Sequence, residues 1–221
     1  MITYDFAFES GRHIRFDVDP ERPARAPAND DPHWLRLEFH QCDHCPLSQG
    51  PNCPAAADLR EIVDAFADVA STERTLVRVE TPARTYEKSC DVQTGLGSLV
   101  GLVMATSGCP TLSRMRPMAR THLPFSTIEE TLFRTTSTYL LGEYLRAARG
   151  EKPGFGLDGL SALYADLSQL NNAFAVRLRT AAEKDANLNA VVRLFSLSAL
   201  VQMSVDRGMR LVAPWFEDAP E

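Results

Sequence analysis

The sequence has no apolar run long enough to cross a bilayer. Its longest strongly apolar stretch, Leu96 to Ala105, is interrupted by glycine and serine and is well short of the ~20 residues that a membrane-spanning helix needs. The residues from Met1 to Phe6 contain no basic segment followed by an apolar core, so we expect no signal peptide. These absences lead us to expect no membrane partner and a cytoplasmic location.

Positive charge is also in short supply. Lys and Arg number 23 against 29 Asp and Glu, and the net charge of −6 argues against nucleic acid or acidic lipid as a partner of the whole surface. Apolar residues make up 44% and charged residues 24%, which is typical of a globular protein rather than a disordered one. A chain of this length buries roughly 70–75% of its unfolded surface, so it needs no metal merely to have a core. The sequence is compatible with a homo-oligomer and names no physiological partner.

Familiar catalytic motifs are missing. The sequence contains no Gly-x-Gly-x-x-Gly or Walker-type phosphate loop, no Gly-x-Ser-x-Gly nucleophile elbow and no His-Glu-x-x-His. Gly95-Leu96-Gly97 lacks the rest of a dinucleotide fingerprint. Whether the protein is an enzyme therefore stays open.

Alternation of apolar and polar residues predicts a small antiparallel sheet. We expect a β-hairpin over 2–18, a strand over 34–39 that leads into a cysteine cluster, and two paired strands over 75–80 and 83–92. The stretch 19–32 is rich in Pro, Ala, Asp and Arg without a period, which predicts a solvated loop.

Helical spacing of apolar residues predicts helices packed on this sheet and, after them, a helical bundle. The complete prediction is an α+β fold, with an α/β metal-site region over 1–125 and a C-terminal helical region over 126–221 packed with it as one globular unit. The helices are expected over 54–70, 94–106, 126–150, 160–184 and 185–207.

Two helix ends carry specific signals. Ser126 and Glu129 have the spacing of a capping box, in which each side chain bonds the main-chain amide of the other residue. Gly108 follows the helix expected over 94–106 and is suited to the left-handed conformation that ends many helices.

Four of the five cysteines lie in short clusters punctuated by proline: Cys42, Cys45, Cys53 and Cys109. A Cys-x-x-Cys pair brings two sulfurs together locally, and single cysteines from elsewhere complete a four-thiolate site. Proline directly follows three of these cysteines, and a Cys-Pro pair also closes the ferredoxin-type iron–sulfur run. We therefore predict a four-cysteine metal centre that holds either an iron–sulfur cluster or zinc, with a redox role or a purely structural one.

Other uses of these cysteines remain open. They could be small buried apolar residues, or Cys42 and Cys45 could form a redox-active pair. If the metal is zinc, a histidine could replace one cysteine, and the protein could be a zinc-stabilised interaction module without catalysis. Cys90 stands alone in an expected strand and is interpreted as a packing residue. The histidines considered are His40, His44 and His122.

A basic stretch follows Cys109. Arginine is suited to bidentate contact with phosphate or carboxylate, so this stretch could bind an anionic substrate or a nucleotide, and the alternative is a solvated basic turn. The candidate anion-binding residues are Arg114, Arg116, Arg120 and His122.

The motifs together resemble an uncharacterised bacterial family of the domain-of-unknown-function kind. The resemblance is carried by Gln-Cys-x-x-Cys-Pro-Leu at 41–47, Ser-Gly-Cys-Pro at 107–110 and Pro-Met-Ala-Arg-x-His-Leu-Pro-Phe at 117–125. It extends from about Trp34 to the third C-terminal helix. Such a family implies that the motifs form one unit and implies no activity.

Overall fold

The computed structural model describes residues 1–23, 25–26, 28, 30–181 and 184–217. The chain divides into two compact units, 1–125 with 169–194 and 126–168 with 195–221. The first boundary between the units follows Phe125, which is where we expected the metal-site region to end. Residues 169–194, however, belong to the same unit as 1–125 and not to the unit that contains the other C-terminal residues. The first unit contains the sheet and all five cysteines, and the second is helical.

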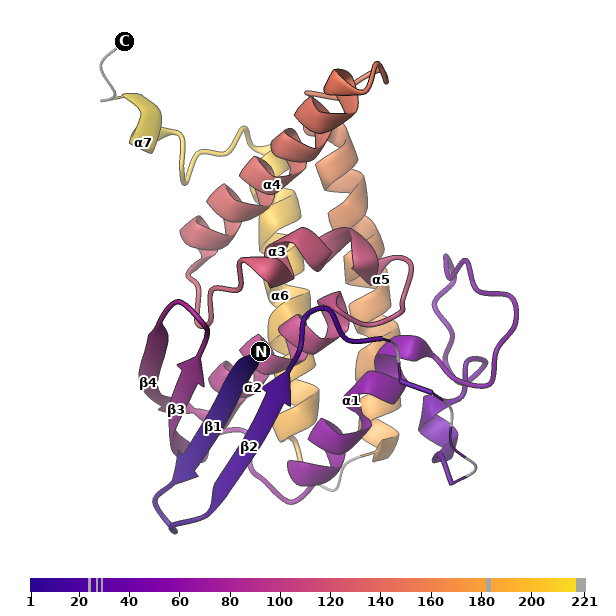
Figure 1. The fold of residues 1–221 in the computed structure, drawn as a ribbon, viewed down its shortest axis with the longest axis vertical. Helices are drawn as coiled ribbons and strands as arrows, with labels where there is room; N and C mark the ends of the chain where they lie inside the picture. The colour runs from indigo at the N-terminus through magenta and orange to yellow at the C-terminus, as the bar shows by residue number, and fades with distance from the viewer. Residues whose placement is uncertain (24, 27, 29, 182–183, 218–221) are drawn as a thin grey trace. The chain divides into compact units, whose positions relative to one another are not determined.

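The sheet of the first unit is antiparallel and four-stranded, in the order β2-β1-β3-β4 (Figure 1). Its strands are β1 Ile2–Phe8, β2 His13–Val18, β3 Arg74–Glu80 and β4 Thr85–Asp91. Alternate residues of β1 are buried, and Tyr4 and Phe6 are completely so. This pattern arises because successive side chains of a strand point to opposite faces. The predicted hairpin and the predicted strand pair are thus confirmed, as is the α+β fold.

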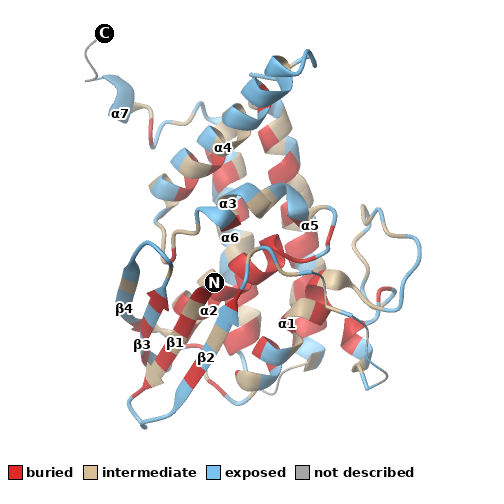
Figure 2. Ribbon diagram, viewed as in Figure 1, coloured by how far each residue is buried: buried red, intermediate tan, exposed pale blue. Residues whose placement is uncertain are grey.

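Two helices of the first unit contribute many of its other buried residues (Figure 2). These are α1 Pro54–Ala65 and α2 Val92–Ala105, which contact each other. α2 lies so close to the sheet that a Cβ atom at Gly95 would be 2.7 Å from a methyl carbon of Val77. Glycine at this position therefore permits the close approach of helix and sheet.

The strand predicted over 34–39 is wrong. His33–Leu35 forms a short 3-10 helix, η1, and turns follow it. Leu35 and Leu37 are buried, as the alternation indicated, but the carbonyl groups of Trp34 and Leu37 accept hydrogen bonds from the side chain of Arg177 instead of a neighbouring strand. A tertiary contact has thus taken the hydrogen-bonding groups that a strand would use.

The left-handed cap predicted at Gly108 is also wrong. α2 ends at Ala105, and its last carbonyl groups accept hydrogen bonds from the hydroxyls of Thr106 and Ser107, at 3.0 Å to Leu102 and 2.7 Å to Met104. Because these side chains satisfy the helix end, no glycine cap is needed. In the described part of the chain, left-handed glycines occur at 11, 50, 150 and 208.

The second unit consists of α4, parts of two longer helices and a short terminal helix. The ranges are α4 Ile128–Ala148, α5 Asp158–Ala181, α6 Ala186–Asp206 and α7 Pro214–Glu217. A capping box starts α4, but one residue later than predicted, with Thr127 and Glu130 bonded to each other's amides at 3.2 and 2.8 Å. Within this unit, the buried Tyr164 hydroxyl donates to Thr135 at 2.9 Å.

Helix α6 is long and apolar enough to cross a membrane by length and composition, although serines and other polar residues divide its apolar residues into short runs. In the window that meets this criterion, 28% of the residues are buried. Core helices of soluble proteins meet the same criterion, so it is weak evidence for a membrane span.

Candidate metal centre

Four cysteines of the first unit line one cavity. They are the four that the sequence pattern grouped, whereas Cys90 is buried on β4 outside the lining. The apolar part of the lining includes Leu37, Leu170 and Phe174. The structure therefore brings together cysteines that are up to 67 positions apart, from Cys42 to Cys109.

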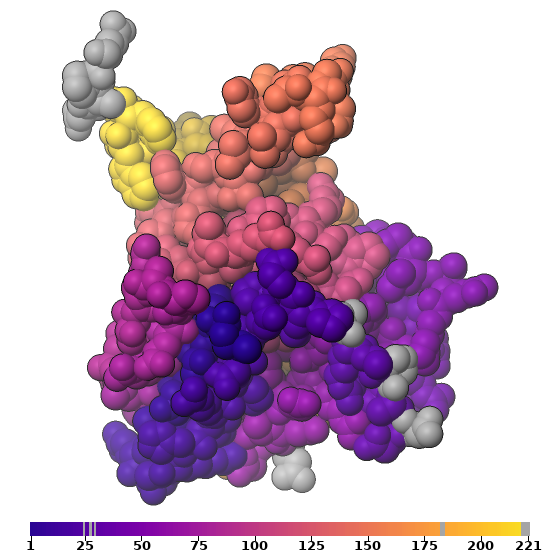
Figure 3. Space-filling model, viewed as in Figure 1, coloured from indigo at the N-terminus to yellow at the C-terminus, as the bar shows by residue number. Residues whose placement is uncertain are grey.

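Main-chain hydrogen bonds shape the segment that carries the first three cysteines. Residues 36 and 52 form an isolated antiparallel bridge, and the Cys53 amide donates to the Leu35 carbonyl at 2.8 Å. Within the loop, the Cys45 amide donates to the Cys42 carbonyl at 2.9 Å, which folds the Cys-x-x-Cys pair into a turn. The segment forms the purple lobe of the first unit in Figure 3. Its two ends are thus held together while Cys42 and Cys45 remain partly exposed.

Cys53 occupies the N-cap of α1, and Pro54 takes the first helical position. Proline is favoured there because its missing amide proton would have no partner in the helix. Cys53 is therefore held in a fixed place at the start of the helix.

Cys109 follows α2 and is buried. Its carbonyl accepts a hydrogen bond from the Ser113 amide at 2.9 Å, so the chain turns immediately into the short 3-10 helix η2 Leu112–Met115. The main-chain amides of Leu112 and Thr111 act to lower the pKa of Cys109, against the effect of its burial. Amide groups near a sulfur stabilise a thiolate and tune metal–sulfur centres.

Arg177 of α5 also lines the cavity, and no sequence motif pointed to it. Its side chain is among the most buried in the protein, with the residue 2% exposed. The guanidinium donates at 2.8 Å to the carbonyl oxygens of Trp34 and Arg36 and at 3.1 Å to that of Leu37. Within the described residues, no carboxylate forms an ion pair with it. The sequence could not predict these hydrogen bonds. Every residue has a main-chain carbonyl group, so no residue type marks which carbonyl groups Arg177 binds.

Burial raises the pKa of two cysteines that line the cavity and lowers the pKa of Arg177. It raises the pKa of Cys42 to about 12 and raises the pKa of Cys109, although the amide donors to Cys109 counteract the effect. It lowers the pKa of Arg177, while the neighbouring cysteines, Cys53 and Cys42 foremost, act in the other direction. Without a cation in the cavity, the Cys42 thiol would be protonated at neutral pH, and metal binding would displace its proton.

The structure does not hold these groups in a finished ligand geometry. Among the described residues, no three His, Cys, Asp or Glu side chains are close enough together to hold one metal ion. The prediction of a metal centre is therefore a matter for experiment. Of the histidines considered as alternative ligands, His44 has its Nδ1 3.1 Å from the Gln169 side-chain oxygen, and its Nε2 is buried without a hydrogen bond.

The basic stretch after Cys109 does not contribute to the lining of the cavity. Arg114 lies on η2, while Arg116 and Arg120 lie on α3 Arg116–Arg120. Arg120 is neutralised by a bidentate pair with Glu21, with distances of 2.8 and 2.9 Å. His122 Nε2 lies 2.5 Å from the hydroxyl oxygen of the buried Tyr4. At least three of the four predicted anion-binding residues, Arg114, Arg120 and His122, thus have partners already.

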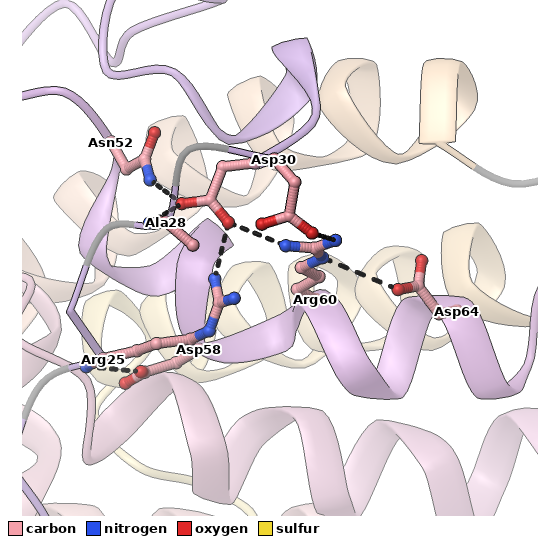
Figure 4. Close-up of polar contacts among 8 residues, drawn as sticks. Arg25, Ala28, Asp30, Asn52, Asp58, Arg60 and Asp64 are labelled. Carbon is pink, nitrogen blue, oxygen red and sulfur yellow. Dashed lines mark hydrogen bonds and ion pairs between the residues drawn. The ribbon is translucent and has the colours of Figure 1, made fainter.

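An ionic network ties the loop after β2 to the cysteine segment (Figure 4). The Asp31 carboxylate accepts from Arg60 at 2.8 Å, from Arg25 at 3.1 Å and from the side chain of Asn52, the residue before Cys53. The Ala28 amide is the main cause of the lowering of the Asp31 pKa, to about 2. The solvated loop predicted here is confirmed for its described residues, none of which is buried, and ion pairs of partly buried side chains fix it to α1.

The fold and the cavity define an α+β protein with a cysteine-lined site. The chain belongs to the family described as Domain of unknown function (DUF6901), whose model matches residues 2–217. The match includes the N-terminal hairpin, which the sequence resemblance had not covered. No curated protein and no solved structure matches the chain.

Proposed function

We propose that this is a metal-binding protein whose centre is held by Cys42, Cys45, Cys53 and Cys109. The observation that carries the proposal is the environment of Arg177, a buried cation that has no carboxylate partner among the described residues and lies at the wall of a cavity lined by four cysteines. A buried charge is costly unless an opposite charge or a full set of hydrogen bonds compensates it. Three carbonyl groups supply hydrogen bonds to Arg177 but no negative charge.

A metal–thiolate centre would supply that charge. Four thiolates around a divalent cation leave a net charge of about −2, since each thiolate contributes −1. Zinc and iron–sulfur centres both use deprotonated cysteines. The guanidinium and the bound centre would therefore stabilise each other.

Elemental analysis of protein purified without oxygen tests the proposal. We expect a stoichiometric transition metal in the wild type and in Cys90→Ser, because Cys90 is a buried cysteine outside the cavity. Cys109→Ser should lose the metal and unfold at a lower temperature. If the wild type retains no metal, and added metal changes neither its melting temperature nor its spectrum, the proposal is wrong.

A redox-active dithiol is the competing use of the same residues. It requires Cys42 and Cys45 to cycle between thiols and a disulfide, which mass spectrometry after thiol alkylation would detect. It predicts activity in metal-free protein that is lost in Cys42→Ser and retained in Cys109→Ser. The proposed metal centre predicts that both substitutions remove the metal.

A further inference from the structure

We propose that the outer face of α4 is the contact surface between two copies of this chain, which pair as an antiparallel, two-fold symmetric dimer. The surface is separate from the proposed metal centre, because all of its residues lie in the second unit. Two features support the pairing: an apolar stripe that α4 leaves exposed, and the opposite charges at the two ends of the helix.

Helix α4 carries apolar side chains on two sides. On one side, Leu132 is completely buried and Thr135 accepts a hydrogen bond from Tyr164 of α5. On the other side, residues three or four positions apart form a single face, as they do on any helix. We define the α4 stripe as the exposed residues Phe133, Ser137, Leu141, Tyr144, Leu145 and Ala148.

The second unit holds most of the exposed apolar side chains. Of the large ones that are exposed in the described part of the chain, ten lie in the second unit and four in the first, although the second unit is the smaller. Within the α4 stripe, Leu141 is 58% exposed and Tyr144 is 62% exposed. A continuous exposed apolar face indicates an interaction surface, whereas single exposed leucines do not.

Aromatic side chains of α7 extend the stripe at its N-terminal end. The centroid of the Phe133 ring lies 6.0 Å from that of Trp215 and 6.4 Å from that of Phe216. Both α7 rings are more than half exposed, and α7 is pale blue in Figure 2. Exposed Phe and Trp are typical of contacts between proteins, because these side chains supply a large apolar area.

The charges at the ends of α4 favour a second copy as the partner. Its first turn is acidic, with Glu129 and Glu130. At its C-terminal end three basic residues stand against two acidic ones, which pair with the arginines: Arg146, Arg149, Lys152, Glu143 and Glu151. The helix is thus negative at its start and positive at its end, so it is complementary to a second, antiparallel copy of itself.

A two-fold axis through the middle of the stripe satisfies both features. An axis midway between positions 133 and 145 places Phe133 of each copy opposite Leu145 of the other. It also places Ser137 opposite Leu141, so a small and a large side chain meet near the axis. A parallel pairing would bring like charges together at both ends, and charge therefore fixes the direction.

Sedimentation equilibrium of the full chain, with a reductant to prevent disulfides between the free cysteines, tests the proposal. We expect a reversible dimer with a dissociation constant of about 10 μM or lower. Leu141→Glu puts charge into the stripe of both copies and should raise this constant at least about a hundredfold. Leu76→Glu is the matched control and should leave the dimer intact, because Leu76 is an exposed leucine of β3 in the first unit.

Charge reversal tests the direction of the pairing. The same axis brings Glu129 opposite Arg149, so Glu129→Arg and Arg149→Glu should each raise the dissociation constant about tenfold. The double variant restores a pair of opposite charges and should dimerise within about threefold of the wild type. These exposed positions also decide the question if Leu141→Glu does not fold, which circular dichroism would reveal.

Four outcomes would overturn the proposal. The first is a wild type that stays monomeric up to about 100 μM. The second is a dimer that Leu141→Glu leaves intact, or that Leu76→Glu weakens equally. The third is a double charge variant that dimerises no better than the single ones. The fourth is a monomeric wild type that sediments with phosphatidylcholine vesicles, which would make the stripe a membrane-binding face. Each readout is independent of metal content, so the proposed function stands or falls separately.

Discussion

Arg177 and Trp34 are 143 positions apart and are joined by a 2.8 Å hydrogen bond from the guanidinium Nη1 to the main-chain carbonyl oxygen. Together with the bonds to Arg36 and Leu37, it fixes the segment that leads into the first cysteines. A helix of the C-terminal half of the chain therefore determines the shape of the N-terminal half of the site.

Arg177→Met should lower both the stability and the metal affinity of the protein. It removes a charge and three donors and leaves three carbonyl groups without that partner, which we expect to cost at least about 3 kcal/mol in the free energy of unfolding. Arg177→Lys keeps the charge but not the planar fork, so it should lose stability and retain more metal than Arg177→Met. Urea unfolding and metal analysis measure the two effects.

Arg179→Met is the matched control, because Arg179 lies on the same helix and is exposed. It should change the free energy of unfolding by less than about 0.5 kcal/mol. If a cluster is bound, Arg177→Met should also make its reduction potential more negative, since a nearby positive charge favours the reduced and more negative state. Equal potentials in Arg177→Lys and Arg177→Met would contradict this electrostatic role.

Asp31 should make stability depend on pH in the acid range. Its pKa falls from 3.8 to about 2 on folding, so the ionised carboxylate is the form that stabilises the native state. The stabilisation should be complete above about pH 5 and should disappear as the pH falls towards about 2. In urea unfolding, Asp31→Asn should be less stable than the wild type at neutral pH, and the difference should shrink below about pH 4.

Asp30→Asn is the control for this experiment. The Asp30 side chain is 77% exposed and pairs with Arg60 at 3.1 Å, whereas the Asp31 side chain is 5% exposed. Exposed pairs contribute little, so Asp30→Asn should change stability far less than Asp31→Asn does. A pH dependence in Asp31→Asn as steep as in the wild type would show that other carboxylates cause the acid sensitivity.

The capping box at the start of α4 lies at Ser126 in the sequence-based prediction and at Thr127 in the structure, and two substitutions distinguish these positions. Thr127→Ala should destabilise the protein by about 1 kcal/mol, because the Thr127 hydroxyl accepts from the Glu130 amide at the start of α4. Ser126→Ala should cost less, since the Ser126 hydroxyl contacts the hydroxyl of Thr131 rather than a helix amide. Thermal unfolding of the two variants decides between the two positions of the cap, and a larger loss in Ser126→Ala would favour the sequence-based position.

Two glycines in helices should respond to alanine in opposite ways. Gly95→Ala should destabilise by about 1–3 kcal/mol, because its Cβ would be 2.7 Å from Val77 and 2.8 Å from Phe6. Gly142 of α4 has open space at the same position, so Gly142→Ala should stabilise by about 0.5–1 kcal/mol through helix propensity. Chemical denaturation compares them, and a stabilised Gly95→Ala would mean that α2 and the sheet can separate at no cost.

Periodicity predicted most of the secondary structure because neighbouring residues share an element and a buried face. The hairpin of β1 and β2, the pair β3 and β4 and the start of α1 at Pro54 follow from patterns within a few residues. At 34–39 the alternation was correct for burial, but the main-chain carbonyl groups accept hydrogen bonds from Arg177 instead of from a strand. Local pattern carries no information about a partner that is more than a hundred residues away.

The cysteine set was predictable for a related reason. Cysteine is scarce in this chain, and the clusters at 42–53 and 109 stand out from the single Cys90 without any knowledge of the fold. The structure places these four around one cavity and adds Arg177 to its lining, which no motif contains.

The sequence by itself determined the types of element, the apolar faces and the side chains that can bind a metal, because each depends on residue chemistry at short range. Only the tertiary structure decided that Arg177 would face the cysteines, that Glu21 would neutralise Arg120, and that the loop around Asp31 would be held on α1. These interactions join segments that are far apart in the chain through charges and main-chain carbonyl groups. Their geometry exists only once the helices and the sheet have packed.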